Sequence, residues 1–536
     1  MLKLIKKYSI TVLLLIVNTP LYSQITTGDT NVVITTRYRP EIIETDKISI
    51  LPQLAEPSVS ERTYTYHFPT ILYYPQSVYT PIDPIFLKPE KAEILFDNYI
   101  EVAGGNYLSS FFNANIHNTQ HEYNTYGLNL RHHAANQSSN PKNALFSDNY
   151  IKVFGLREKG DDVYAEIEYQ RNAINYYGYL DKFSDLSVDS IKQIFHDITS
   201  KAQWNKDKPK YKNQLELELN LFNHQNFNEQ TIDLVNSFEK SIQSNLVQLD
   251  IEANYTQFSS TSTYNRFTLS FKPHYNLKYK KINLDIGLNA NYLLDSNTNY
   301  LYIAPSVGVE TDIIPKKIKA YLGGFGNLDQ NTFKSLSREN LFIGNNTMYL
   351  NPYIWTFYTG MHGSFNKVVQ FGFDLKHEII KDQYFFVNDT SVLRSFVTIK
   401  DDLNKTTLSG EIKIDLNKKF SFNILGNYYS YALVTQQKAW HMPSHDLSFI
   451  AKTHLANKIY LSGSYYMSSS RDAINLAGEQ NTLEAINDIN LAFEYRYKPN
   501  ISGFLQVNNI LNNRYQLWNN YRAQGLNALA GISFSL

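Results

Sequence analysis

The sequence predicts an all-β protein, a transmembrane antiparallel β-barrel of roughly 18–22 strands with an extended, proline-rich N-terminal segment. Three observations support this fold class. Long parts of the chain alternate between apolar and polar residues with a period of two, as strands with one apolar face do. The N-terminus has the order of an export signal. The chain holds 41 tyrosines and 31 phenylalanines, and tyrosine suits boundaries between water and an apolar phase.

Residues 1–23 are predicted to be a cleaved signal peptide. Lys3, Lys6 and Lys7 precede an apolar run over residues 10–17, and small and polar residues follow up to Ser23. This order of basic, apolar and small residues is typical of a secretory signal. A membrane anchor is the alternative, but a spanning helix needs about 20 apolar residues.

Residues 24–96 are predicted to be an extended periplasmic segment. Eight of the chain's 17 prolines lie between residues 40 and 96. Proline has no amide donor and disfavours helix in the residue before it. We therefore expect a tether rather than a folded domain.

Residues 97–536 are predicted to form the barrel. In residues 214–222 four leucines share one face, and Glu216, Glu218 and Asn220 share the other. The same alternation recurs in residues 247–255, 282–290 and 489–497. At about 20 residues per strand and connection, the region would hold roughly 22 strands. One exception is residues 187–202, where apolar residues at helical spacing predict a short helix in a loop.

A soluble β-sandwich also alternates, but three features favour a membrane barrel. A single series of about twenty strands exceeds the usual open sheet, and closure removes its exposed edges. Charged residues on the polar faces are expected of strands that line a watery lumen. The tyrosine pairs at residues 176–177, 428–429 and 465–466 are predicted to belong to the aromatic girdles at the membrane boundaries, with scattered surface tyrosines as the alternative.

Composition excludes several function classes. The chain has no cysteine, which excludes disulfides, thiolate metal sites and a lipid anchor on cysteine. Lys+Arg and Asp+Glu are equal at 50 each, so no net charge indicates nucleic-acid binding. No catalytic signature such as a Gly-x-Ser-x-Gly elbow or a His-Glu-x-x-His helix occurs. We predict no enzyme, no catalytic residue and no cofactor.

Two groups of polar residues could still carry chemistry. His117 with His121, and His441 with His445, have the spacing of two metal ligands on one helix, but they lie in predicted strands and turns. We interpret them as polar loop residues and predict no metal site. Five acids are predicted to face the lumen, where we expect each to be solvated, with a selective lining or cation site as the alternative: Glu216, Glu218, Asp250, Glu252 and Asp285.

The C-terminal residues predict a closing barrel strand. Ile532, Phe534 and Leu536 alternate with small and polar residues, which is similar to the signal by which the barrel assembly machinery recognises outer-membrane barrels. That signal usually ends on an aromatic residue, whereas this chain ends on Leu536.

Both ends of the chain resemble TonB-dependent receptors. The positions Asn509, Leu511, Asn513 and Tyr515, followed by Gly531, match the Asn-Leu-Phe-Asn-Lys-x-Tyr pattern and the glycine-containing final strand of that family. The tract at residues 29–37 looks like the segment around a TonB box, which implies contact of Val32, Val33, Ile34 and Thr35 with a TonB-type energy coupler. A disordered tail is the alternative reading of this tract.

The resemblance fails where that family has a plug domain. Only the proline-rich residues 40–96 separate the box-like tract from the first predicted strand. Their length is close to the lower limit for an independent domain, and their composition argues against one. The chain therefore resembles plugless relatives of the Bacteroidetes type. A lumen this wide needs an occluding part, for which residues 25–96, inward loops and another subunit are the candidates.

Two functions follow from this reading. The first is ligand transport across the outer membrane of a Gram-negative cell, with lipid, the assembly machinery and the energy coupler as partners. The alternative is a structural or assembly subunit of an outer-membrane complex.

Overall fold

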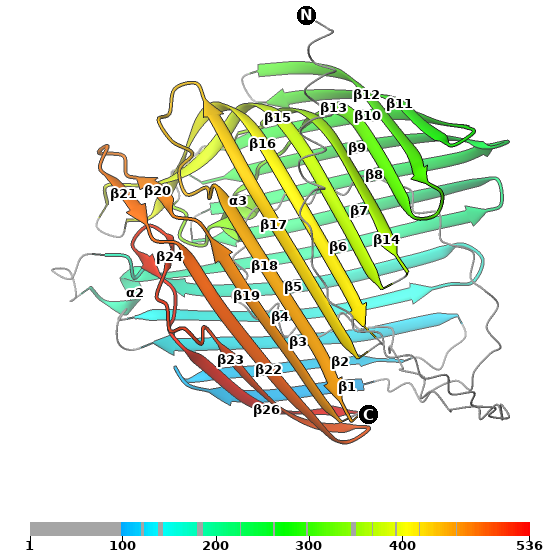
Figure 1. Ribbon diagram of the computed structural model, residues 1–536. Coiled ribbons are helices and arrows are strands. Elements are labelled where there is room, and N and C mark those ends of the chain that lie inside the picture. Colours follow the sequence, from blue (N-terminus) through cyan, green and yellow to red (C-terminus); the bar gives the residue numbers. More distant parts are fainter. Residues whose placement is uncertain are drawn as a thin grey trace, which may run out of the picture. The chain divides into compact units, whose positions relative to one another are not determined.

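The computed structural model describes residues 98–536 except 119–122, 138–142, 180–185, 226, 261–262, 296–297, 345–349, 367, 392–393, 417–418 and 457. In this part of the chain, 22 strands form one antiparallel sheet (Figure 1). The sheet closes on itself because β1 (Asn98–Gly105) pairs with β26 (Asn527–Ser535). The predicted fold class is confirmed. The predicted signal peptide, the proline-rich segment and the tract at Val32 to Thr35 lie outside the described residues.

The other barrel strands follow in chain order: β2 (Ser109–His117), β3 (Asn124–Gln137), β4 (Ala144–Arg157), β5 (Asp162–Asn175), β6 (Lys192–Lys208), β7 (Tyr211–His224), β8 (Phe227–Ile242), β9 (Asn245–Ser259), β10 (Thr263–Tyr279), β11 (Ile282–Asp295), β12 (Thr298–Ile314), β13 (Ile318–Leu328), β14 (Tyr353–Phe365), β15 (Val369–Asn388), β16 (Phe396–Leu416), β17 (Phe420–Leu433), β18 (His445–Leu455), β19 (Ile459–Ser468), β22 (Ile486–Lys498) and β23 (Ile501–Asn508).

The connections carry shorter elements: α2 (Val188–Ile191), α3 (Phe333–Glu339), the paired β20 (Arg471–Ile474) and β21 (Gln480–Leu483), and the paired β24 (Gln516–Trp518) and β25 (Tyr521–Arg522). Among the described residues, no helix is long and apolar enough to cross a membrane.

The two faces of the wall follow the alternation in the sequence. The four leucines of β7 are 38 to 51 % exposed, and Ile167 of β5 and Leu234 of β8 are exposed in the same way. On the opposite face, Glu216 forms an ion pair with Lys201 of β6 at 2.6 Å. An outer face of exposed aliphatic side chains is unfavourable in water and is expected against lipid.

The two ends of the barrel differ in their connections. The end that holds residues 98 and 536 has short turns, such as residues 209–210 and 280–281. The opposite end has long connections, such as residues 329–352 and 509–526. We call these the turn end and the loop end. In outer-membrane barrels the short turns lie in the periplasm and the longer loops lie outside.

Strands β12 and β13 separate near the loop end. β12 pairs with β11 over residues 298–311, but its ladder with β13 begins only at Val307. Pro305 has no N–H to donate to a neighbouring strand. Beside it, the carbonyl of Gly326 in β13 accepts a hydrogen bond from Asn289 Nδ2 at 2.9 Å, and Asn289 is a buried side chain of β11. Residues 298–306 therefore have a strand ladder on one side only.

The predicted helix over residues 187–202 is wrong for most of its length. α2 ends at Ile191, and the residues from Lys192 onward belong to β6. Phe195 is buried on the lumen side against Phe222, with ring centroids 6.0 Å apart, whereas Ile198 is 40 % exposed on the outer face. Apolar residues occupy both faces of this strand, and their combined spacing in the sequence resembles the spacing of apolar residues on one face of a helix.

Only part of the predicted tyrosine girdle is present. Tyr428 is 56 % exposed on the outer face of β17, as a girdle residue would be,. Its neighbour Tyr429 points to the other face and donates a hydrogen bond to Asp446 at 2.8 Å, because adjacent strand residues face opposite ways. Tyr176 is buried in a connection, so the prediction for that pair is wrong.

Candidate functional site

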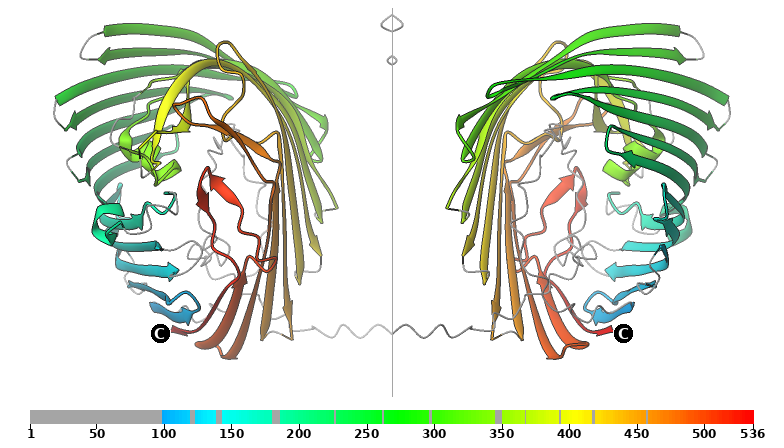
Figure 2. Two further views of the ribbon diagram at one scale, coloured as in Figure 1. Left: turned by 90° about the vertical axis from the view of Figure 1, so that its left-hand side faces the viewer. Right: turned by 90° about the vertical axis from the view of Figure 1, so that its right-hand side faces the viewer.

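Long connections fold into the lumen at the loop end. We call their described residues the cap: the connections 176–191, 329–352, 389–395, 434–444, 469–485 and 509–526, with the adjoining ends of β15 and β16. Figure 2 shows α3 and the β24–β25 hairpin inside the ring of strands. Of the three candidates for occluding the lumen, inward loops are therefore present at this end.

The cap has an aromatic core that joins distant parts of the chain. Phe342 and Tyr521 stack with ring centroids 3.7 Å apart, and Tyr177 packs edge-on against both. Phe333 of α3 is fully buried and packs on Phe227 of β8 at 4.6 Å. The residues of this core come from the wall and from three connections, and include Tyr176, Ile191, Phe222, Phe258, Leu336, Ile343, Phe386 and Phe396. These side chains are packed together like a protein interior, without water between them.

Charged groups attach α3 to the inner wall. Asp197 of β6 binds Lys334 Nζ at 3.1 Å and Arg338 Nη2 at 2.9 Å. The Asp197 and Lys334 side chains are 7 and 14 % exposed, so their ion pair is largely removed from water, whereas Arg338 is 49 % exposed. Glu229 Oε2 of β8 accepts a hydrogen bond from the Phe333 backbone N–H at 2.7 Å. A carboxylate in this place satisfies N–H groups that the first turn of a helix leaves unpaired.

An arginine holds the two ends of the same connection. Arg266 of β10 is 1 % exposed, and its Nη1 donates to the Asn331 carbonyl at 2.9 Å and to Asn351 Oδ1 at 2.7 Å. Its Nε and Nη2, together with Glu229 Oε1 and Asn331 Nδ2, have no hydrogen-bond partner among the described residues. Buried polar atoms without partners lower the stability of the closed arrangement. The contact between α3 and the wall thus has two parts: an aromatic part through Phe333, and a polar part that is incompletely satisfied.

The ends of β15 and β16 bend inward at a defined place. The ladder between them is irregular between Ile380 and Gln383, and Asp382 has a positive φ of 59°. The Asp382 N–H donates to Asp402 Oδ1 at 2.9 Å, and its carboxylate binds Lys400 Nζ at 2.7 Å. A bulge of this kind bends a strand, and here it turns the tip of the hairpin into the cap.

Two titratable groups of the cap are shifted by burial. Burial raises the pKa of Glu339 at the end of α3 to about 7, although Tyr384 donates a hydrogen bond to it at 2.6 Å. Burial lowers the pKa of His441 to about 3, so this imidazole is neutral at physiological pH. His441 Nδ1 lies 3.0 Å from the Phe386 carbonyl, and its Nε2 accepts the Asn519 backbone N–H at 3.4 Å. His441 therefore joins its own connection to β15 and to the connection 509–526.

The predicted acids of the lumen do not gather into one site. Besides Glu216, Glu252 binds Lys272 at 2.8 Å, and Asp285 lies 3.1 Å from His274. Similar pairs on other strands are Lys152 with Glu166 and Lys319 with Glu310. The inner wall therefore mixes both charges across neighbouring strands. No group of three histidines or acids in the described part of the chain could hold a metal ion.

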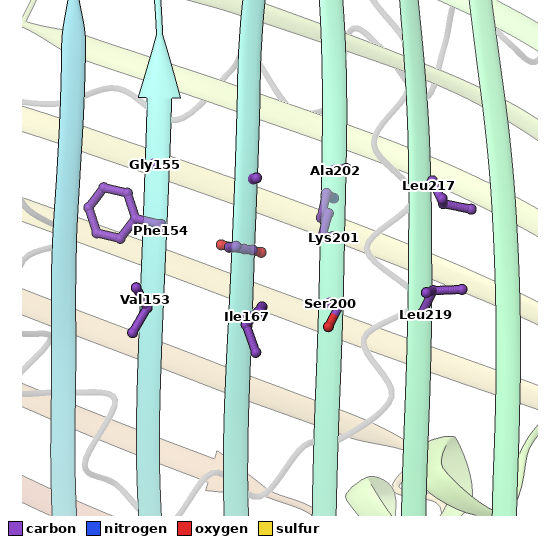
Figure 3. A pocket seen from close by; sticks show the side chains of 11 residues that line it. Val153, Phe154, Gly155, Ile167, Ser200, Lys201, Ala202, Leu217 and Leu219 are labelled. Carbon is purple, nitrogen blue, oxygen red and sulfur yellow. The ribbon is translucent and has the colours of Figure 1, made fainter.

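A shallow groove of about 440 Å³ crosses β4 to β7 (Figure 3). Gly155, Ala165 and Ala202 are register neighbours along its floor. Val153 and Ile167, which also line it, are exposed on the outer face. The groove belongs to the aliphatic outer surface and not to the lumen.

The predicted C-terminal residues lie on β26. Ile532, Phe534 and Leu536 are 50, 39 and 61 % exposed, on the face that carries the exposed aliphatic residues. Gly531 points the other way, where a Cβ would overlap the Phe504 ring and lie 2.6 Å from Ala103 Cβ.

Two of the motif residues on which the family resemblance rests, Asn509 and Tyr515, make side-chain hydrogen bonds. The Asn509 side chain accepts the Asn513 N–H at 3.0 Å and donates to the Gln524 carbonyl at 2.8 Å. Tyr515 donates a hydrogen bond to Asp488 at 2.8 Å. These contacts fix the connection that carries β24 and β25.

Sequence reasoning missed the residues that attach the cap. Asp197, Glu229 and Arg266 lie on strands in which apolar and polar residues alternate. Nothing in the sequence distinguishes them from other polar residues that face the lumen. A signal was present in residues 332–335, where Thr332 and Ser335 form a capping box at the start of α3,. The long interval between β13 and β14 also marks a connection large enough to reach the lumen.

The sequence matches no known protein family and no curated protein. The fold is similar to solved outer-membrane receptors. The siderophore receptor PiuA from Acinetobacter baumannii has a TM-score of 0.64 at 9 % identity, covering 83 % of this chain and 82 % of that one. The pyoverdine outer membrane receptor FpvA from Pseudomonas aeruginosa gives 0.64 at 9 %, covering 83 % and 79 %. The FrpB iron transporter from Neisseria meningitidis gives 0.65 at 8 %, covering 82 % and 81 %.

This likeness concerns the fold, and the expected resemblance to the barrel of outer-membrane receptors is confirmed at that level. The closed wall of 22 strands has an exposed aliphatic outer face and a charged inner face. Those are the features of a barrel whose outside meets lipid and whose inside meets water. The chain is an integral β-barrel protein of the outer membrane.

Proposed function

We propose that the protein transports a ligand across the outer membrane and that the cap serves as its gate in place of a plug domain. The observation that carries this proposal is the attachment of α3 to the wall through Asp197, Lys334 and Arg338. This connection also packs in the aromatic core through Phe333, but its ion pairs and incompletely satisfied polar atoms cost less to detach than an apolar contact of the same size. The similar structures are named as receptors and a transporter, which supports a transport role over an enzymatic one.

Conductance of single barrels in a planar bilayer tests the gate. Asp197→Asn leaves Lys334 and Arg338 without their carboxylate, and because Arg338 is 49 % exposed, we expect the loss to be smaller than the cost of breaking a fully buried pair. We expect frequent large openings in this variant and rare openings in the parent protein. The matched control is Asp207→Asn on the same strand, because the Asp207–Lys212 pair is exposed and contributes about 1 kcal/mol at most. Equal conductance of the parent and both variants would contradict the gate.

Energy coupling is a separate part of the proposal. We propose that Val32 to Thr35 contact a TonB-type coupler, on the strength of the box-like tract at residues 29–37. Deletion of residues 30–37 is expected to abolish uptake of the ligand in cells and to leave the amount of folded barrel unchanged. Unchanged uptake would argue against coupling while leaving the gate intact.

A structural subunit of an outer-membrane complex is the second candidate. It is favoured by the aromatic core of the cap, in which Tyr177, Phe342 and Tyr521 pack like the interior of a folded domain. A permanently sealed barrel that passes no current after Asp197→Asn is the expected behaviour of such a scaffold.

A further inference from the structure

Three side chains from neighbouring strands β2, β3 and β4 form a hydrogen-bonded chain. Ser110 Oγ lies 3.0 Å from His132 Nε2, and His132 Nδ1 lies 2.7 Å from Asn149 Oδ1. Asn149 Nδ2 in turn donates to Ser147 Oγ at 3.0 Å. A serine hydroxyl, an imidazole and an acceptor that orients the imidazole, in this order, are the arrangement of a nucleophile with its general base.

The hydrogen bonds of Asn149 fix the state of the imidazole. Because its Nδ2 donates to Ser147, its Oδ1 is turned toward His132, and an amide oxygen can only accept. His132 Nδ1 therefore carries the proton. His132 Nε2 is left to accept the hydrogen bond of the Ser110 hydroxyl, and this is the direction of proton transfer that activates a serine.

The three residues lie on the outer face of the barrel and not in the lumen. Strand residues two apart share a face. Ile151, two residues from Asn149, is 45 % exposed on the aliphatic outer face, and the register places Asn149 opposite His132. Ser110 lies opposite Gly104 of β1, two residues from Val102, which is 50 % exposed.

Apolar surface lies on both sides of this group of residues. The residues just named, Val102 and Ile151, lie nearer the turn end. Leu108, in the connection between β1 and β2, lies nearer the loop end than Ser110 and is 80 % exposed. Such a surface is unfavourable in water and is expected against lipid. An ionisable residue in contact with lipid is costly, and where one occurs it commonly has a function.

The Ser110 hydroxyl is accessible from outside the barrel. Ser110 is exposed, and the residues directly opposite it on the two neighbouring strands are Gly104 and Ala134. Neither has a side chain large enough to cover the hydroxyl. A lipid lying along the outer face can therefore bring an acyl group to this serine.

We propose that Ser110, His132 and Asn149 hydrolyse the acyl ester of a membrane lipid. Ser110 Oγ attacks the carbonyl carbon of the ester, and its proton passes to His132 Nε2. His132 gives this proton to the alcohol oxygen as the ester C–O bond breaks, which leaves the acyl group on Ser110. One water molecule, activated by His132 in the same way, releases the fatty acid and restores the serine. Asn149 is a positioning residue, because it acts through His132.

This activity is independent of the proposed transport, because it uses the outer face and not the lumen. It also differs from the prediction that the chain has no catalytic residue. That prediction rested on local motifs, whereas a group of this kind is defined by its geometry and not by its spacing in the sequence. The three residues come from three strands and become neighbours only through the register.

Fatty-acid release from vesicles tests the proposal. The full chain is placed in vesicles of phosphatidylethanolamine in one arm. The other arm uses lipopolysaccharide mixed with an ether phospholipid, which has no acyl ester. We expect release in at least one arm, which identifies the lipid, and a loss of about a thousandfold or more in Ser110→Ala. Ser200→Ala is the matched control, because Ser200 lines the groove on the outer face and should leave the rate unchanged.

A fluorophosphonate that reacts with activated serines tests the nucleophile directly. We expect an adduct at Ser110 in the wild-type protein and none in Ser110→Ala or His132→Ala, with the folded state of each variant checked by its heat-modifiable band on gels. Asn149→Ala is expected to lower the rate about a hundredfold. Asn149→Asp should restore it, because a carboxylate also accepts from Nδ1, and a merely structural asparagine would not give this rescue.

Three results would overturn the proposal. The first is a folded wild-type protein without an adduct at Ser110, which means that the hydroxyl is not activated or that another part of the chain covers it. The second is the absence of released fatty acid in both arms. The third is equal release by the wild-type protein and Ser110→Ala, which means that a co-purified hydrolase is responsible.

Discussion

Gly531 lies where the barrel closes, and its missing side chain is a requirement of that closure. A Cβ at this position would overlap the Phe504 ring and the Val102 carbonyl of β1. Gly531→Ala is therefore expected to destabilise the folded barrel by about 1–3 kcal/mol, the usual cost of overpacking. The measurement is the urea midpoint of the heat-modifiable band on gels. Gly155→Ala is the control, because a Cβ there has no atom within 4 Å and should leave the midpoint unchanged. Equal midpoints for both variants would contradict this role of Gly531.

At the scale of single residues, the sequence predicted which face of a strand a side chain lies on, but not which residues it binds. The outward position of Ile532 and Phe534 follows from a period of two, because the period alone fixes the face. The partners of Asp197 do not follow from it. They lie on α3, far along the chain, and depend on a connection that turns inward instead of outward.

At the scale of elements, α3 responds to pH through Glu339. The pKa of this carboxyl is raised to about 7 by burial, and the nearby Asp329 also raises it. A raised pKa means that the closed cap binds the proton more tightly than the open one. The resulting stabilisation is complete below about pH 4.5, is lost as the pH rises through 7, and amounts to about 3 kcal/mol at most.

The corresponding prediction concerns Glu339→Gln. We expect single-channel openings of the parent protein to become more frequent between pH 5 and pH 8, and this rise to be smaller in the variant. His441 acts in the opposite sense, because its lowered pKa removes stability as the pH falls from 6.5. The difference between parent and variant isolates the contribution of Glu339. An identical pH response in the two proteins would rule out its role.

The strands could be predicted from the sequence, whereas the cap could not. Residues 214–222 alternate without interruption because one face meets lipid and the other meets water. Near the loop end, Phe195 packs on the cap while Ile198 faces outward, so both faces are apolar and the alternation disappears. The apolar–polar alternation is therefore lost where the inner face of the wall packs against the cap.

At the scale of the whole molecule, the cap depends on parts of the chain that are synthesised far apart. Tyr177 follows β5, Phe342 follows β13, and Tyr521 precedes β26. Their three-way contact cannot form before the connection that carries β24 and β25 is in place. That connection enters the lumen next to the strand that completes the ring.

Barrel closure and completion of the cap therefore depend on the same stretch of chain. β26 pairs with β1, and the connection that directly precedes β26 brings Tyr521 into the aromatic core. Loss of residues 516–536 would remove both the closing strand and the ring that Tyr177 and Phe342 contact.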